Sequence, residues 1–167
     1  MTHMQIPMSS PDLDGVEMAA VRSVLQGRRL SIGPQLEAFE RAVAGYAGAA
    51  HGVGVNSGTS GLHLCAIAAG VGPGDPVITT PFSFIASANC ILYERAVPIF
   101  VDVDPTTGNI DPALVAEAVH DLTTDDRPST ATHWLPPSHR RPSSAVGRPK
   151  ALLPVHAFGQ PADMDPL

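Results

Sequence analysis

Apolar residues recur along the first 120 positions with two different periods. Over about 14–26 and 34–47 they return every three or four residues, which is the period of a helix with one buried face. At 53–55, 77–80 and 97–101 they instead form short continuous runs, which predict buried strands. The chain therefore begins with two helices and continues with strands.

A helical segment follows each predicted strand, so strand and helix alternate three times. The three segments contain Leu62 to Ile67, then about 83–93 and 112–120. Short apolar strands that alternate with helices predict an α/β fold, a parallel sheet covered by helices on both faces. Ligands of such sheets bind at the carboxyl ends of the strands, where the turns 56–60 and 80–84 are expected.

The turn Asn56-Ser57-Gly58-Thr59-Ser60 carries the first candidate chemistry. A strand that turns sharply into a helix leaves backbone N–H groups without partners at the positive end of the helix dipole, where phosphate binds well. Gly58 allows close approach, and the hydroxyls of Thr59 and Ser60 add donors. The alternative is a turn without a ligand, in which Ser57 or Thr59 is simply the helix N-cap.

Composition narrows the class of protein. The net charge of −6 argues against a nucleic-acid-binding face. No apolar run approaches the ~20 residues of a membrane span, and the N-terminus lacks the pattern of a signal peptide, so we expect a cytoplasmic protein. Cys65 and Cys90 lie in apolar helical segments and are expected to be free buried thiols. The cysteines and the seven histidines show no metal-binding spacing.

Residues 121–149 break the pattern, because Pro, Ser, Thr and Arg dominate them without an apolar period. Such a segment buries too little apolar surface to offset its ordering entropy, and it is expected to be a flexible insertion. A strand at 151–155 and the start of a helix follow. The predicted organisation is 1–120 for the N-terminal helices and first βαβ units, 121–150 for the insertion, and 151–167 for the next strand and helix start of an incomplete domain.

Five blocks of the sequence, taken in order, resemble the DegT/DnrJ/EryC1/StrS family of sugar aminotransferases. The blocks are GRRLSIGPQLEAFERAVAGYAG, GVGVNSGTSGLHL, GDPVITTPFSFIASANCI, PIFVDVDPTTGNIDP and ALLPVHAFGQPADMDPL. They cover about 1–120 and 150–167. The resemblance implies a type I aminotransferase fold that uses pyridoxal 5'-phosphate (PLP), and this chain is similar to the N-terminal part of its large domain.

The resemblance also implies roles for individual residues. Gly58, Thr59 and Ser60 match the turn that holds the cofactor phosphate, and Phe84 matches the aromatic residue that stacks on the pyridine ring. Both roles are physically reasonable, since a phosphate suits a helix N-terminus and a flat apolar ring covers a π-face. From the sequence alone, an ordinary core aromatic is the favoured interpretation of Phe84, and only the family resemblance favours stacking. His156, near the expected carboxyl edge, receives no role.

The residues that the family uses for catalysis are not matched. The resemblance places the Schiff-base lysine and the aspartate beside the pyridine nitrogen downstream of the HAFGQPADMD block, beyond the end of this chain. Lys150, the single lysine, matches a surface position just before a strand. Asp163 and Asp165 match a helix entry, and Asp102 and Asp104 match a structural loop. We therefore expect no catalytic residue in this chain, which alone would be inactive.

The function implied for the complete enzyme is transfer of an amino group, from a donor such as glutamate, to a nucleotide-linked keto sugar. The resemblance further implies a homodimer. Two alternatives stay open, a non-catalytic remnant of the family and an unrelated phosphate-binding α/β domain. The family's dehydratase branch, where His replaces the lysine, also stays open.

Overall fold

The computed structural model describes residues 9–123 and 148–167. The chain forms two compact units, Met1–Gly54 and Val55–Leu167. The predicted insertion at 121–150 lies mostly outside the described residues. Its first positions, 121–123, form the last turn of a helix instead.

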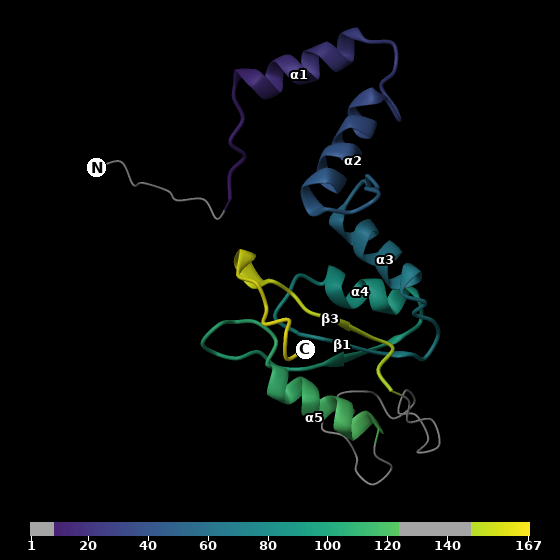
Figure 1. The fold of residues 1–167 in the computed structure, drawn as a ribbon, viewed down its shortest axis with the longest axis vertical. Coiled ribbons are helices and arrows are strands. Elements are labelled where there is room, and N and C mark those ends of the chain that lie inside the picture. The colour runs from purple at the N-terminus through teal and green to yellow at the C-terminus, as the bar shows by residue number, and fades with distance from the viewer. Residues whose placement is uncertain (1–8, 124–147) are drawn as a thin grey trace, which may run out of the picture. The chain divides into compact units, whose positions relative to one another are not determined.

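The first unit contains the two predicted helices, α1 (Gly15–Gln26) and α2 (Pro34–Ala47) (Figure 1). Asp14 caps α1: its carboxylate accepts the N–H of Val16 at 2.6 Å, while Glu17 accepts the N–H of Asp14 at 2.8 Å. This reciprocal capping box satisfies N–H groups that a helix start otherwise leaves without partners. Both helices begin and end close to the positions that the apolar period predicts.

The predicted strand at 53–55 does not form. Val53 is 77% exposed, and the N–H of Gly54 donates to the Glu40 carboxylate at 2.7 Å rather than to a neighbouring strand. Glycines alternate with the valines here, which lowers strand propensity, and no strand in the described part of the chain pairs with the segment. A strand needs such a partner, so the apolar run alone misleads.

The second unit is built on a parallel sheet, as predicted, but within the described residues the sheet has three strands rather than the four that the apolar runs indicate. Its strands are β1 (Pro76–Thr79), β2 (Val97–Phe100) and β3 (Ala151–Leu153), in the order β2-β1-β3. Ile78 in the central strand pairs with Ile99 on one side and Leu152 on the other. The carboxyl ends of all three strands therefore meet at one edge of the sheet.

Helices cover both faces of this sheet. They are α3 (Gly58–Ala68), α4 (Ala86–Tyr93) and α5 (Pro112–Thr123). Figure 1 shows α4 and α5 on opposite sides of the strands. Since successive strand residues face opposite ways, Ile78 packs with Val115 of α5, whereas Val77 packs with Ala66 of α3 and Ile91 of α4. Among the described residues, no helix is long and apolar enough to cross a membrane.

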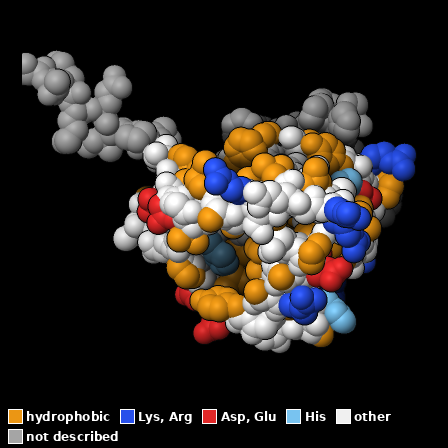
Figure 2. Space-filling view, turned by 90° about the horizontal axis from the view of Figure 1, so that it is seen from above, with side chains coloured by type: hydrophobic (Ala, Val, Ile, Leu, Met, Phe, Trp, Pro, Cys, Tyr) orange, Lys and Arg blue, Asp and Glu red, His pale blue; other side chains and the backbone are white. Residues whose placement is uncertain are grey.

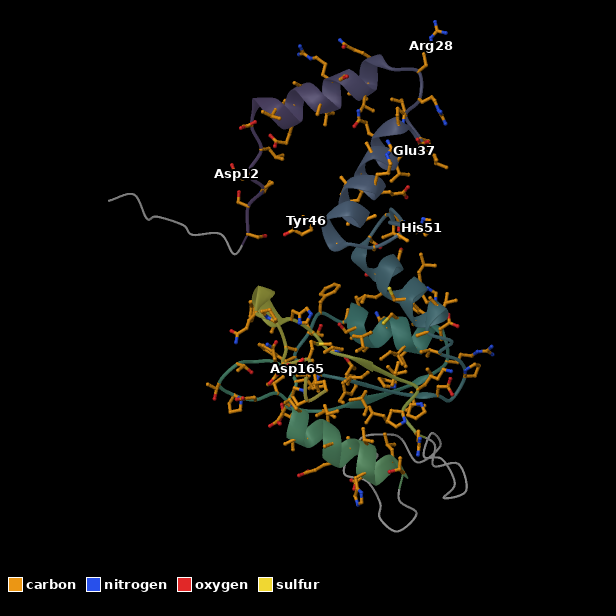
Figure 3. All side chains as sticks on the ribbon, viewed as in Figure 1. Asp12, Arg28, Glu37, Tyr46, His51 and Asp165 are labelled. Carbon is orange, nitrogen blue, oxygen red and sulfur yellow. The ribbon has the colours of Figure 1, made fainter. Side chains whose placement is uncertain are left out.

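Two predicted boundaries shift because of local chemistry. The helix expected from 83 begins only at Ala86, since the Thr80 hydroxyl accepts the N–H of Phe82 and holds 80–85 in a turn. After β3, the expected helix start is a single 3-10 turn, Ala157–Gly159. Pro161 disfavours helical backbone at the residue before it. Asp165, beyond this turn, lies in irregular chain (Figure 3).

The two cysteines differ in exposure, although both were expected to be buried. Cys65 is exposed, and Cys90 is fully buried between α4 and the sheet. Burial raises the pKa of the Cys90 thiol, which further suppresses the reactive thiolate. We expect a thiol reagent such as DTNB to modify Cys65 quickly and Cys90 only after unfolding. Two equally fast thiols in the native protein would contradict this packing.

Candidate functional site

The turn before α3 is organised by its own side chains. Ser57 is the N-cap, and its hydroxyl oxygen accepts the N–H of Ser60 at 3.1 Å. The Ser60 hydroxyl donates to Oδ1 of Asn56 at 2.7 Å and lies 3.0 Å from the Ser57 hydroxyl. Of the two N-cap candidates, Ser57 takes the role, and Thr59 does not.

This arrangement leaves three hydrogen-bond donors at the start of α3 without a partner among the described residues. Within the described residues, no group accepts from the N–H of Gly58, the N–H of Thr59 or the Thr59 hydroxyl. Apart from its chain neighbours and the nearby backbone of α3 itself, nothing described lies within 4 Å of the position that a Cβ on Gly58 would take. About half a positive charge resides at such a helix end, so the turn suits an anion that approaches the backbone closely. The Ser60 hydroxyl would have to break its hydrogen bond to Asn56 before it could donate to such an anion.

Helix α3 is fixed to α4 by a contact that sequence reasoning missed. Nε2 of His63 lies 2.6 Å from Oε1 of Glu94, and the His63 ring meets the edge of Tyr93 with centroids 5.1 Å apart. Both members of the His63–Glu94 pair are partly buried. The pair links positions 31 residues apart and has no local signature in the sequence.

The second predicted turn follows the carboxyl end of β1. Thr79, fully buried, donates its hydroxyl to the Leu153 carbonyl at 2.9 Å and so ties β1 to β3 at this edge. Phe84 lies in the turn between β1 and α4 with 77% of its surface exposed. Within the described chain it is therefore no core aromatic. Exposed apolar side chains are numerous on the face seen in Figure 2.

Lys150 lies at the opposite edge of the sheet. Its backbone N–H donates to the carbonyl of Pro76, the first residue of β1, at 2.8 Å. Because the strands are parallel, this is the amino edge, away from Thr79 and the Phe84 turn. Asp104 organises a turn, since its carboxylate accepts the N–H of Thr106 at 2.6 Å.

Nearly the whole chain matches one family of known proteins. The profile described as "DegT/DnrJ/EryC1/StrS aminotransferase family" matches residues 11–167. The chain belongs to this family. The match confirms the resemblance carried by the five sequence blocks, and it includes both turns. The solved structure of a DegT DnrJ EryC1 StrS aminotransferase from Brucella abortus confirms the α/β fold, with a TM-score of 0.71 and 29% identity over 89% of this chain and 35% of that chain.

Several individual members of the DegT/DnrJ/EryC1/StrS family are similar to this chain in sequence or in structure. The chain is 38% identical to spore coat polysaccharide biosynthesis protein SpsC of Bacillus subtilis over 96% of its own length and 34% of SpsC. It is 35% identical to GDP-perosamine synthase of Caulobacter vibrioides over 98% of this chain and 37% of that protein. NtdA of Bacillus subtilis, solved with bound cofactor PMP, matches with a TM-score of 0.70 and 28% identity over 92% of this chain and 30% of NtdA. The chain thus spans about a third of the length of the curated relatives it matches.

Proposed function

We propose that this chain forms part of a PLP-dependent aminotransferase that acts on nucleotide-linked keto sugars. The observation that carries the proposal is the start of α3 in a chain of the DegT/DnrJ/EryC1/StrS family: Gly58 and Thr59 offer three donors that no described residue pairs with. The names of SpsC and GDP-perosamine synthase support a sugar-nucleotide substrate. A glutamate-like amino donor and a homodimer complete the proposal.

The residues at the start of α3 fit a phosphate. A dianion there would accept from the backbone N–H groups of Gly58 and Thr59 and from the Thr59 hydroxyl, and the helix dipole would stabilise it further. Ser60 would join by rotating its hydroxyl away from Asn56. The His63–Glu94 contact would hold the helix in place while the anion binds.

Phe84 fits a flat ring. Its exposed side chain follows the carboxyl end of β1, the edge where parallel sheets bind ligands. A phenyl ring over the face of a pyridine ring excludes water from that face and fixes the orientation of the ring. The relative NtdA binds PMP, the amine form of the same cofactor, which supports a pyridine ring as the ligand.

When bound, PLP would supply an aldehyde that carries the amino group from donor to acceptor and a pyridine ring that withdraws electrons. This chain's own residues would bind the phosphate and orient the ring. The lysine that the chemistry requires would come from elsewhere, because Lys150 lies at the amino edge of the sheet.

Ligand binding tests the proposal. We expect the purified chain to bind PLP reversibly and more tightly than pyridoxal, which lacks the phosphate. Absorbance titration measures both affinities. Borohydride treatment in the presence of PLP, followed by peptide mass spectrometry, should find no stoichiometric pyridoxyl-lysine at Lys150.

Two results would contradict the assignment. Equal affinity for PLP and pyridoxal would show that the turn before α3 does not bind the cofactor phosphate. A stoichiometric adduct on Lys150, together with transaminase turnover, would show that the active site lies at the other edge of the sheet.

A further inference from the structure

The loop that follows β3, residues 156–162, is held unusually firmly for irregular chain. Asn109, which is 4% exposed, accepts the N–H of Ala157 at 2.9 Å through Oδ1. Its Nδ2 donates to the carbonyls of Gln160 at 3.2 Å and Pro161 at 3.0 Å. One buried amide therefore makes three bonds to a loop about 50 positions away in sequence.

A second contact closes the loop on itself. Nδ1 of His156 accepts the N–H of Ala162 at 2.9 Å. Ala157 and Ala162 are both buried, so the loop is anchored near both ends. His156, to which the sequence assigned no role, thus acts on the backbone of its own loop.

Between these anchors, Phe158 has a costly conformation. Its backbone lies in the left-handed region, with φ 52° and ψ 26°, and its side chain is 96% exposed. A bulky residue pays of order 1 kcal/mol or more for such a backbone, and it persists only where the surroundings impose it. The Asn109 and His156 bonds impose it here, and the result is a large apolar ring held out from the protein.

Among the residues that the structure describes, the exposed ring has one aromatic neighbour. Phe158 meets Phe82 with ring centroids 6.0 Å apart and planes at 68°. Phe82 in turn lies against Gly108, where an added Cβ would be 3.5 Å from its ring. Gly108 and Asn109 are adjacent, so one loop supports both rings. Phe82 follows β1 and Phe158 follows β3, which places the pair at the carboxyl edge of the sheet.

We propose that Phe158, supported by Phe82, is a ligand-contacting residue that packs against a planar heteroaromatic ring, and that Asn109 is its positioning residue. The inference rests on the proposed function, which supplies two sources of such a ring, the pyridine ring of PLP and the base of the nucleotide-linked substrate. Exposed phenyl rings bind either one by stacking or edge contact. The hydrogen bonds of Asn109 and His156 to the loop explain why the Phe158 ring stays exposed instead of packing against the apolar core.

Paired titrations test this and identify the source. Phe158→Ala should weaken binding of either PLP or GDP about 5- to 100-fold, the range found when a stacking aromatic is removed. Phe158→Tyr, which keeps the ring, should restore that affinity. Pyrophosphate, which has no base, should bind wild type and Phe158→Ala alike. Val119→Ala, a partly exposed apolar change on α5, is the matched control and should alter none of these affinities.

Asn109 gives an independent readout. Asn109→Ala should raise the amide exchange of Ala157 and weaken the same ligand as Phe158→Ala, and the double variant should be no weaker than Phe158→Ala alone. Asn109→Asp, which keeps the acceptor for Ala157, should restore part of the protection.

The outcomes separate the two proposals. Suppose that PLP binding depends on Thr59, and that neither PLP binding nor GDP binding changes in Phe158→Ala. That result would overturn this inference and leave the proposed function intact. Loss of GDP affinity alone would assign the ring to the nucleotide base, and loss of PLP affinity alone would assign it to the cofactor. Wild-type chain that binds neither ring would overturn the inference as well.

Discussion

Replacing Thr59 with valine is expected to weaken PLP binding about 10- to 100-fold. Valine keeps the shape of threonine but removes the one hydroxyl at the start of α3 that has no partner among the described residues. A hydrogen bond to a charged group contributes about 1.5–3 kcal/mol, and each 1.4 kcal/mol changes affinity tenfold. Absorbance titration of wild type and Thr59→Val with PLP measures the difference.

Two comparisons make the Thr59 experiment specific. Pyridoxal, without a phosphate, should bind wild type and Thr59→Val equally. Ser60→Ala should have a smaller effect, because the Ser60 hydroxyl already donates to Asn56. If Thr59→Val weakened PLP and pyridoxal by the same factor, the residue would act on the ring or on folding, and the phosphate assignment would be wrong.

Replacing Ile78 with alanine is expected to lower the free energy of unfolding by about 2–5 kcal/mol. Ile78 is 1% exposed in the central strand and packs with Ile99, Val115 and Leu122. Alanine would leave a cavity between the sheet and α5, with lost contacts on every side. Domains are stable by only about 5–15 kcal/mol, so this single change removes a large share. Urea denaturation followed by circular dichroism measures it.

Milder variants keep the Ile78 test decisive if the alanine variant does not fold. Ile78→Val should cost about 0.5–1.5 kcal/mol, since only one methylene is removed. Val119→Ala, on helix α5 but with a side chain that is 37% exposed, should cost less than Ile78→Ala. Equal losses at Ile78 and Val119 would show that the sheet and α5 do not form the core described above.

Local pattern was sufficient for the elements whose residues interact with near neighbours. Asp14 and Glu17 cap a helix within one turn, and Pro34 suits a first helical position, so both N-terminal helices follow from the sequence. The strands around Ile78 and Ile99 are apolar on both faces, as a central parallel sheet requires. The five sequence blocks that resemble the family indicate the same elements more specifically, and the profile match confirms the family resemblance.

The candidate site could be predicted only in part. The sequence places Gly58, Thr59 and Ser60 at a helix start, because a Gly/Ser-rich turn before an apolar helical period marks one. It does not reveal that Ser57 and Asn56 engage the hydroxyl of Ser60, since rotamers depend on the folded turn. It also favours a buried Phe84, because an aromatic residue in an apolar segment usually joins the core, whereas the side chain is 77% exposed in the structure.

The sequence by itself determined helices α1 to α5 to within a few residues, the three strands that pair in the parallel sheet, and the family, because each depends on periodicity or on runs of adjacent residues. The tertiary structure alone decided that 53–55 is not a strand, that His63 meets Glu94, and that Asn109 holds the loop of Phe158. A strand exists only beside a partner, and these side-chain contacts join residues 31 and 48 positions apart. No local pattern encodes such pairs, since loop closure and packing bring them together only when the chain folds.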